Sequence, residues 1–214
     1  MTKIAVLGGT GYAGRHIVAE AADRGFEVTS YSRNLPDEQI ASVTYVLGNV
    51  TDTDTLIEAV SNSDVVVCAL APRGELSENL RSVTDRLFAL ANSHGTRVGI
   101  VGGAGSLEAA PGGPLVMEGE HFPAHILPEA STIAAVLADA RATPPSLDWF
   151  MLSPAAMFGS YNPGVKTGAF RLGGDQLVSD ADGKSDISGA DYAIAFVDEI
   201  EKPQHSRQRF TAAY

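Results

Sequence analysis

The sequence predicts a doubly wound parallel α/β sheet, the Rossmann fold, in a single domain. Three observations predict it. Strand and helix signals alternate along most of the chain, the strand segments are rich in β-branched residues, and a glycine-rich turn joins the first strand to the first helix. Strand–helix alternation requires right-handed crossovers between parallel strands. The chain of 214 residues suits one domain with a sizeable core, so we expect residues 1–214 to form one domain.

The first two elements are the most clearly marked. An apolar strand over Lys3–Leu7 runs into the glycine-rich residues 8–14, which run into a helix over about 12–24. Apolar residues recur on one face of that helix, and Gly25 follows it as a plausible C-cap.

The next elements continue the alternation. Further strands are expected at 27–32, 43–47, 65–70, 97–101 and 147–152, and helices at 54–62, 76–94 and 128–142. The run 65–70 is apolar throughout, as expected of a strand covered on both faces.

The C-terminal part differs in character. We expect short strands at 168–172 and 176–179, a helix that Ser188 opens through a capping box with Asp191 and that continues to Ile200, and a last strand at 207–214. Residues 155–214 are therefore predicted to form a small α/β elaboration on the substrate side of the sheet.

The glycines of residues 8–14 have a spacing that suits a dinucleotide. Gly8, Gly11 and Gly14 follow G-x-x-G-x-x-G, and Gly9, Gly11 and Gly14 satisfy G-x-G-x-x-G. The first glycine allows a sharp turn, the second a close approach of the pyrophosphate, and the third close packing of helix on strand. The helix N-terminus offers N–H groups to phosphate. The alternative is a glycine-rich turn that only packs.

A ligand of such a sheet lies across the carboxyl ends of the strands. The residues expected to contact the cofactor there are Gly8, Thr10, Gly11, Tyr12, Ala13, Gly14, Arg33, Asn49, Val50, Leu70, Ala71, Gly102, Gly103, Ala104, Ser153 and Pro154. Gly102 and Gly103 would let the nicotinamide ribose approach the backbone, although they could also form only a tight turn. Pro154 would pack near the nicotinamide.

The end of the second strand selects between the two nicotinamide dinucleotides. An NAD site usually has an acidic residue there, and an NADP site an arginine. Here Arg33 ends the strand and no acid follows until Asp37. Arg33 can form a fork of hydrogen bonds to a 2′-phosphate, so we expect NADP(H) in preference to NAD(H). The alternative is a solvated surface arginine.

Composition narrows the possible partners and the location. The formal net charge of −11 argues against nucleic acid and anionic membrane, because their phosphates would be repelled. The single cysteine, Cys68, lies in an apolar run, where a buried structural thiol is expected, and permits no internal disulfide. The N-terminal apolar run ends at Gly8, short of a signal peptide, and no stretch would span a bilayer. We expect a cytoplasmic protein.

Several segments together carry a family resemblance. They are 8–14, 48–50, 102–107, 147–149, 152–155, 167–168, 187–188 and 191–193. With them the chain resembles the atypical short-chain dehydrogenases/reductases, in particular the bacterial family named after NADH-flavin reductase, and more distantly biliverdin reductase B. The resemblance implies an NAD(P)H-dependent oxidoreductase with a flavin as one substrate candidate.

The acid–base pair of alcohol-oxidising relatives is missing. Those enzymes use Tyr-x-x-x-Lys, whereas Tyr161 is followed by Lys166 five residues on. Ser106 stands near the position of their serine and could hydrogen-bond a substrate carbonyl or only cap a turn. In the long Pro- and Gly-containing segment 107–127, expected to wall the substrate pocket, His121 could line that pocket. His121 and His125 do not have metal-ligand spacing, so no metal is expected.

Without an acid–base pair, the chemistry favoured is one that needs none. Hydride transfer from NADPH to a flavin, quinone or similar conjugated small molecule meets that condition, because the acceptor ring takes up the charge. Two alternatives stay open: an NADP(H)-sensing regulatory protein with little turnover, and a reductase or isomerase of a biosynthetic intermediate. The sequence leaves the acceptor and the oligomeric state undefined.

Overall fold

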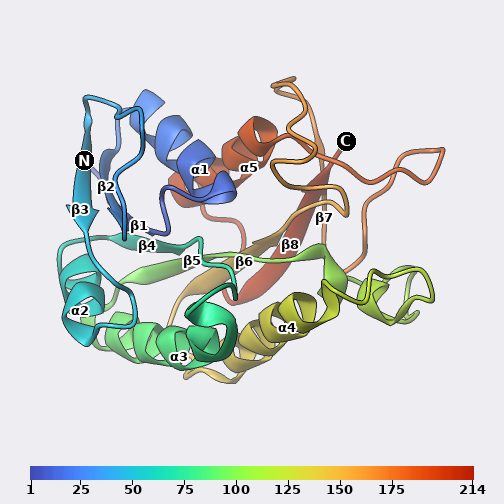
Figure 1. Cartoon of the computed structure of the whole chain (residues 1–214), viewed down its shortest axis with the longest axis horizontal. Helices are drawn as coiled ribbons and strands as arrows, with labels where there is room; N and C mark the ends of the chain where they lie inside the picture. The colour runs from blue at the N-terminus through green and yellow to red at the C-terminus, as the bar shows by residue number, and fades with distance from the viewer.

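The computed structural model describes residues 1–214 and contains one eight-stranded sheet with helices on both faces (Figure 1). The strands are β1 (Lys3–Leu7), β2 (Glu27–Ser32), β3 (Val43–Leu47), β4 (Val65–Cys68), β5 (Arg97–Val101), β6 (Trp149–Ser153), β7 (Arg171–Gly173) and β8 (Gln208–Ala213). The helices are α1 (Tyr12–Asp23), α2 (Thr53–Ser61), α3 (Leu76–His94), α4 (Leu127–Ala142) and α5 (Gly189–Glu201), with 3-10 turns η1 (Ala104–Ser106) and η2 (Val116–Glu118).

The strand order β3-β2-β1-β4-β5-β6-β8-β7 confirms the predicted doubly wound sheet. All neighbouring strands are parallel except the edge strand β7, which is antiparallel to β8. The chain moves outward from β1 to β2 and β3, and then returns to place β4 on the other side of β1. The strand order therefore reverses between β1 and β4, where ligands of such sheets bind.

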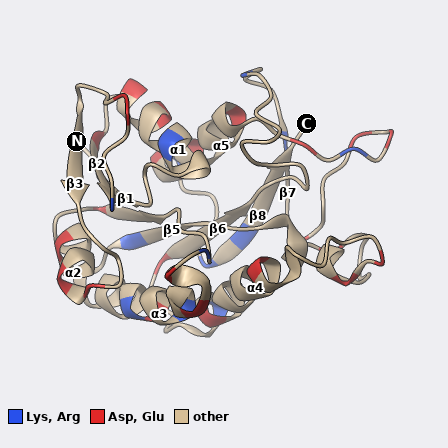
Figure 2. Ribbon diagram, viewed as in Figure 1, with Lys and Arg blue, Asp and Glu red and all other residues tan.

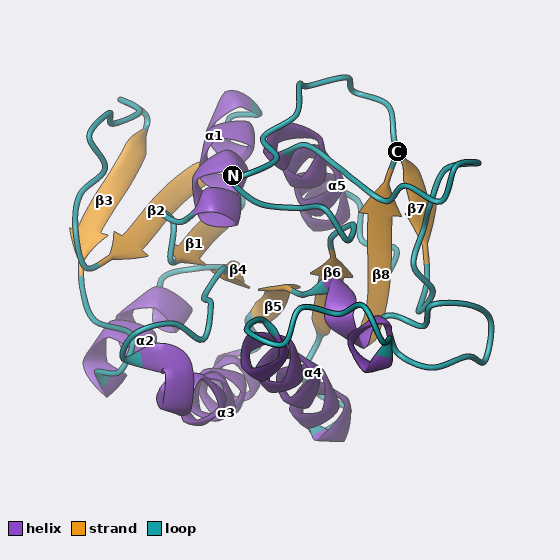
Figure 3. Ribbon diagram, turned by 45° about the vertical axis from the view of Figure 1, so that its right-hand side comes forward, coloured by secondary structure: helices purple, strands orange, loops and turns teal.

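The sheet separates two hydrophobic layers. Helices α2, α3 and α4 cover one face, and α1 and α5 cover the other (Figures 1 and 3). Adjacent residues of β6 show the alternation: Trp149 packs into the layer of α3 and α4, and Phe150 into the layer of α1 and α5, and both are fully buried. No helix combines the length and the apolar character needed to cross a membrane.

The C-terminal residues 155–214 extend the main sheet. β8 pairs in parallel with β6, and β7 then pairs with β8, while α5 lies against α1. Figure 2 shows lysines and arginines dispersed over many elements among the acidic residues, with no run of basic residues along one element.

Two short elements differ from prediction. The expected strand at 176–179 is wrong, because this segment makes only an isolated bridge from Gln176 to Glu108. The strand expected at 168–172 begins only at Arg171. Upstream of it, the N–H groups of Thr167 and Gly168 donate to the Asp191 side chain instead of to a neighbouring strand.

The capping box predicted at the start of α5 is half present. The Ser188 hydroxyl accepts a hydrogen bond from the Asp191 N–H at 3.0 Å, as predicted. The Asp191 carboxylate does not return to the Ser188 N–H, which donates to Tyr214 instead. Elsewhere β4 ends two residues before the predicted end and β6 begins two residues after the predicted start.

A buried ion pair ties the end of α5 to the start of β5. Arg97 Nη2 donates to Glu199 Oε1 at 2.7 Å, and the same guanidinium donates to the carbonyls of Glu199 and His205 at 2.8 Å each. His205 Nδ1 lies 2.7 Å from Glu199 Oε2. Burial raises the pKa of Glu199, but the hydrogen bonds from Arg97 and His205 outweigh it and hold the pKa below the usual glutamate range.

Glu199→Ala is expected to lower the free energy of unfolding by about 3 kcal/mol, since it removes the buried partner of Arg97 and leaves only the 45% exposed Asp148 carboxylate, 2.9 Å from Arg97 Nε. Glu201→Ala is the matched control, because Glu201 lies on the same helix, pairs with Arg24 and is 45% exposed; its loss should stay below about 1 kcal/mol. Urea unfolding at pH 7 measures both. Equal losses would contradict a special contribution from Glu199.

The same pair predicts a pH dependence. Because folding lowers the pKa of Glu199, the stability from its ionised form is fully present above the unfolded-state pKa, about 4.3, and is lost as the pH falls through the lower folded-state pKa. The difference in free energy of unfolding between the wild type and Glu199→Gln should therefore become smaller as the pH is lowered, and urea unfolding at several pH values measures it.

Candidate dinucleotide-binding site

The structure gathers the sequence-predicted cofactor residues at the carboxyl edge of the sheet. Residues 8–14 follow β1, Arg33 follows β2, Asn49 and Val50 follow β3, and Leu70 and Ala71 follow β4. Gly102, Gly103 and Ala104 follow β5, and Ser153 and Pro154 stand at the end of β6. The neighbouring parallel strands bring these turns side by side.

Gly8 and Gly14 allow α1 to approach the sheet closely. Gly8 has a φ of +81°, and a Cβ there would lie 2.6 Å from the Ala69 carbonyl oxygen. A Cβ at Gly14 would collide with the Gly8 carbonyl oxygen. At these two positions the requirement for glycine comes from packing inside the protein.

Gly11 is different, because packing inside the protein requires a glycine there much less than at Gly8 and Gly14. Its φ of −69° and ψ of 171° suit any residue, and a Cβ would meet only the Gly8 carbonyl oxygen, at a slightly tight 3.3 Å. The N–H groups of Tyr12, Ala13 and Gly14 have no acceptor within the chain. Open space over Gly11 and three free donors at the start of a 12-residue helix fit a pyrophosphate.

The turn after β2 carries a free cation. Arg33 is exposed and makes no ion pair or hydrogen bond within the protein. The neighbouring Ser32 hydroxyl donates to the Asn34 carbonyl at 2.7 Å, so its proton is already used. Arg33 is thus the available phosphate ligand of this turn.

Sequence reasoning missed an acidic residue beside Asn49. The Asn49 amide donates to Glu75 Oε2 at 3.2 Å, and the Thr51 hydroxyl donates to Glu75 Oε1 at 3.2 Å. Glu75 stands just before α3, and the turn residues Pro72 and Gly74 ahead of that helix were the available signal. These hydrogen bonds hold the Glu75 carboxylate against the turn after β3.

A second pair missed by sequence reasoning bridges the turn after β4 and the first turn of α4. Arg73 donates to Glu129 through Nε at 2.8 Å and Nη2 at 3.0 Å. Next to Glu129, Ala130 packs against Gly105, where a Cβ would lie 2.8 Å from the alanine Cβ. The pair therefore joins the turn that holds Ala71 to the helix that supports η1.

Of the two glycines that follow β5, only Gly102 is required by packing inside the protein. A Cβ at Gly102 would lie 2.9 Å from the Ser153 hydroxyl oxygen, whereas at Gly103 it would make only an ordinary contact with Ile133, at 3.4 Å. The Ser153 hydroxyl is fully buried and has no hydrogen-bond partner. A role of Gly103 and Ser153 at the nicotinamide stays a prediction.

The two candidate catalytic residues lie apart. The carbonyl and hydroxyl oxygens of Ser106 accept hydrogen bonds from Arg209 Nη1 at 3.1 and 3.2 Å. Arg209 of β8 therefore holds both Ser106 oxygens at the end of η1. There Ser106 lines a pocket of about 220 Å³ along α4. His121 is exposed in the segment between η2 and α4.

The structure forms neither a Tyr–Lys acid–base pair nor a metal-binding cluster in place of Ser106 and His121. The Tyr161 side chain is 68% exposed, and Lys166 pairs with Glu20 at 2.9 Å. No group of three or more His, Cys, Asp or Glu side chains is placed to hold a metal. Burial raises the pKa of the Cys68 thiol to about 11, so this cysteine is no nucleophile near neutral pH.

Gly11→Val and Gly14→Val should separate binding from packing. Gly11→Val should keep the thermal stability of the wild type but lose NADPH binding, because its side chain enters the open space over the loop. Gly14→Val should lose about 1–3 kcal/mol of stability or more through overpacking. Thermal melting and NADPH titration by calorimetry measure both properties. Wild-type NADPH affinity in folded Gly11→Val would remove the pyrophosphate from this loop.

Comparison with known proteins agrees with this geometry. The sequence profile of a family described as NAD(P)H-binding matches residues 8–203. The uncharacterized protein YwnB of Bacillus subtilis is 38% identical over 213 residues, which cover 98% of this chain and 97% of YwnB.

Two solved structures are also similar along the whole chain. A "putative exported protein" of Burkholderia pseudomallei has 40% identity and a TM-score of 0.88, with 100% of both chains covered. A "putative NADH-flavin reductase" of Streptococcus pneumoniae has 31% identity and a TM-score of 0.89, with 100% of this chain and 99% of that chain covered. The chain belongs to the NAD(P)H-binding family of atypical short-chain dehydrogenases/reductases.

Proposed function

We propose that the protein is an NADPH-dependent oxidoreductase, in which the nicotinamide supplies hydride to a flavin, quinone or similar conjugated acceptor. The observation that carries the proposal is the loop at Gly11, with open space above it and three free N–H donors behind it. Residues 8–14 would hold the pyrophosphate, Arg33 the 2′-phosphate, and Asn49 and Val50 the adenosine. The turns after β4, β5 and β6 would hold the nicotinamide half.

The preference for NADPH rests on charge. Arg33 is free to form a fork to a phosphate, while Glu75 at this edge accepts hydrogen bonds from Asn49 and Thr51. An NAD site would instead offer a free carboxylate to the ribose hydroxyls. The name of the Streptococcus pneumoniae protein mentions NADH, so the two proteins would differ in this respect.

Arg33→Asp should lower NADPH affinity at least about tenfold and affect NADH far less, because it removes a charge-assisted fork and adds repulsion. Titration of both dinucleotides into wild type and variant measures the effect. Arg15→Asp is the matched control, since Arg15 lies on α1 with its guanidinium 5.4 Å from the Tyr12 ring and no ion pair. Equal losses of NADPH and NADH affinity in Arg33→Asp would exclude 2′-phosphate recognition by Arg33.

The acceptor class follows from the groups that are missing. Reduction of a carbonyl needs a positioned proton donor, whereas a conjugated ring can take up the charge and receive its proton from water. The Ser106 oxygens are engaged with Arg209, and no Tyr–Lys pair is formed. The protein would then act mainly by orienting two flat rings and excluding water between them.

Four substitutions test this chemistry: Ser106→Ala, His121→Ala, Ser153→Ala and Tyr161→Phe. A positioned general acid or base contributes about 10²–10⁴-fold, so each variant should instead lose less than about tenfold in turnover of FMN or a quinone. Bulky residues at Gly103 or Ala104 should cost more, because they displace the nicotinamide. The turnover should be flat in pH near neutrality.

Other outcomes would favour the other functions. A bell-shaped pH profile with one of the four variants nearly inactive would support acid–base reduction of a biosynthetic carbonyl compound. Tight NADPH binding without turnover of any flavin or quinone would support a dinucleotide-sensing protein.

A further inference from the structure

Tyr12 connects the start of α1 to the C-terminal part of the chain. Its N–H is one of the three free donors beside Gly11. Its hydroxyl accepts a hydrogen bond from the Gly189 N–H at 3.1 Å and donates to the Pro163 carbonyl at a longer 3.5 Å. Burial raises the pKa of the Tyr12 phenol, so the hydroxyl keeps the proton that it donates.

The Tyr12 ring is held by aromatic contacts. It lies edge-on to His16 at 5.1 Å and to Phe158 at 5.2 Å between ring centroids, and Phe158 in turn packs on buried Tyr192 at 4.6 Å. These contacts leave the side chain little freedom to turn away from Gly189 and Pro163.

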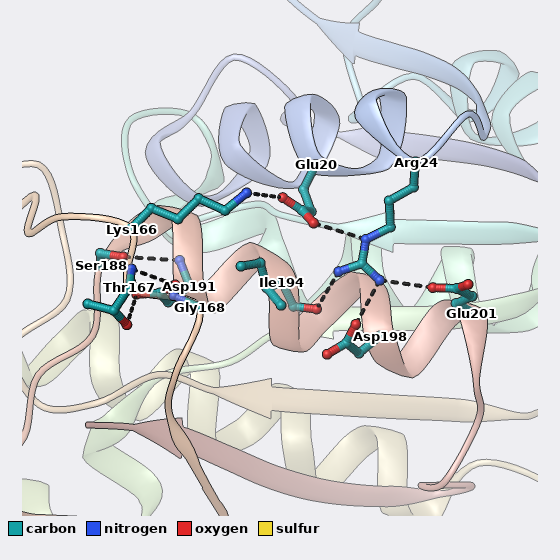
Figure 4. Close-up of polar contacts among 10 residues, drawn as sticks. All are labelled: Glu20, Arg24, Lys166, Thr167, Gly168, Ser188, Asp191, Ile194, Asp198 and Glu201. Atoms are coloured by element: carbon teal, nitrogen blue, oxygen red, sulfur yellow. Dashed lines mark hydrogen bonds and ion pairs between the residues drawn. The ribbon is translucent and has the colours of Figure 1, made fainter.

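Pro163 belongs to a segment, residues 159–168, that we call the strap. The strap contains no helix or strand. Its far end is fixed by Asp191, whose carboxylate accepts from the Thr167 N–H at 2.9 Å and the Gly168 N–H at 2.8 Å (Figure 4). The same carboxylate accepts from the Tyr214 hydroxyl at 2.5 Å. Lys166 of the strap also pairs with Glu20 of α1 (Figure 4).

The middle of the strap is held less firmly than its end. Two of its apolar side chains are largely exposed, Tyr161 at 68% and Val165 at 75%. Along 160–164, Pro163 contacts Tyr12, Gly164 packs on Ser188, and the Asn162 amide donates to the Met157 carbonyl at 3.0 Å. Exposed apolar side chains next to the carboxyl edge of the sheet suit the wall of a pocket for a flat conjugated molecule.

We propose that Tyr12 is a positioning residue that links occupancy of the phosphate loop to the position of the strap. One residue presents its main-chain N–H to the pyrophosphate and its hydroxyl to the strap, so a dinucleotide that fixes the first turn of α1 also reduces opening of residues 159–168. This inference rests on the proposed function and adds to it an order of events, in which the dinucleotide forms the acceptor wall before the acceptor binds.

Amide hydrogen exchange of the full chain with and without NADPH tests the link without any turnover. In wild type, NADPH should slow exchange in 159–168 at least about fivefold, the low end of typical couplings between two sites. Tyr12→Phe keeps the ring and the N–H, so NADPH affinity should fall by no more than about threefold, yet the slowing in the strap should drop below about twofold.

Two further tyrosines provide matched controls. Tyr214→Phe removes a strap anchor whose hydroxyl bonds to Val165, Asp191 and Ser188 and to no residue of the phosphate loop, so exchange in 159–168 should rise with and without NADPH while the slowing by NADPH persists. Tyr161→Phe alters a strap side chain for which no hydrogen bond is formed, and should change nothing.

The outcomes separate this inference from the proposed function. NADPH binding to wild type without slower exchange in the strap would overturn the link and leave the proposed function standing. Wild-type slowing in Tyr12→Phe would also overturn it. Failure of wild type to bind NADPH or NADH would overturn both.

Discussion

The contact between Gly14 and the Gly8 carbonyl determines where the rest of the site can be. With no Cβ at Gly14, α1 begins directly against the end of β1, at the place where the strand order reverses. A larger residue would push the helix outward and turn its first N–H groups away from the carboxyl edge. The donors of Tyr12, Ala13 and Gly14 are free because a helix N-terminus has donors that the helix itself cannot satisfy, and the close packing determines where they point.

The position of α1 in turn determines where the C-terminal third of the chain lies. α5 packs along α1, and Arg24 joins the two helices through Glu20, Asp198 and Glu201 (Figure 4). Asp198 and Glu201 are about half exposed, so these pairs orient the helices more than they stabilise them. The larger stabilisation comes from fully buried Tyr192 and Phe196 of α5. Asp191 at the start of the same helix then fixes the strap beside the phosphate loop.

The local sequence pattern was sufficient to predict most of the fold, but it predicted less of the candidate site. Except between β2 and β3, a helix separates each pair of successive strands from β1 to β6, and the strands are rich in apolar residues, so their order and approximate bounds could be predicted from sequence. The segment 176–179 has a strand-like composition, yet its only strand-type pairing is the isolated bridge from Gln176 to Glu108, a partner far away in the sequence. Similarly, the Ser106–Arg209 and Arg73–Glu129 contacts join residues 103 and 56 positions apart, and no local spacing encodes them.

Those long-range contacts also bear on what the site can do. Several polar side chains near the site hold the fold: the Ser106 oxygens accept from Arg209, Lys166 pairs with Glu20, and the Tyr12 hydroxyl joins α5 to the strap. The groups left free at the carboxyl edge include main-chain N–H donors, the buried Ser153 hydroxyl and the guanidinium groups of Arg33 and Arg15, none of which gives up a proton readily near neutral pH. A site with this set of groups can hold and orient a dinucleotide. Its chemistry therefore has to come from the nicotinamide and from a ring that accepts hydride without help from an acid, which is the physical reason to seek the substrate among conjugated molecules.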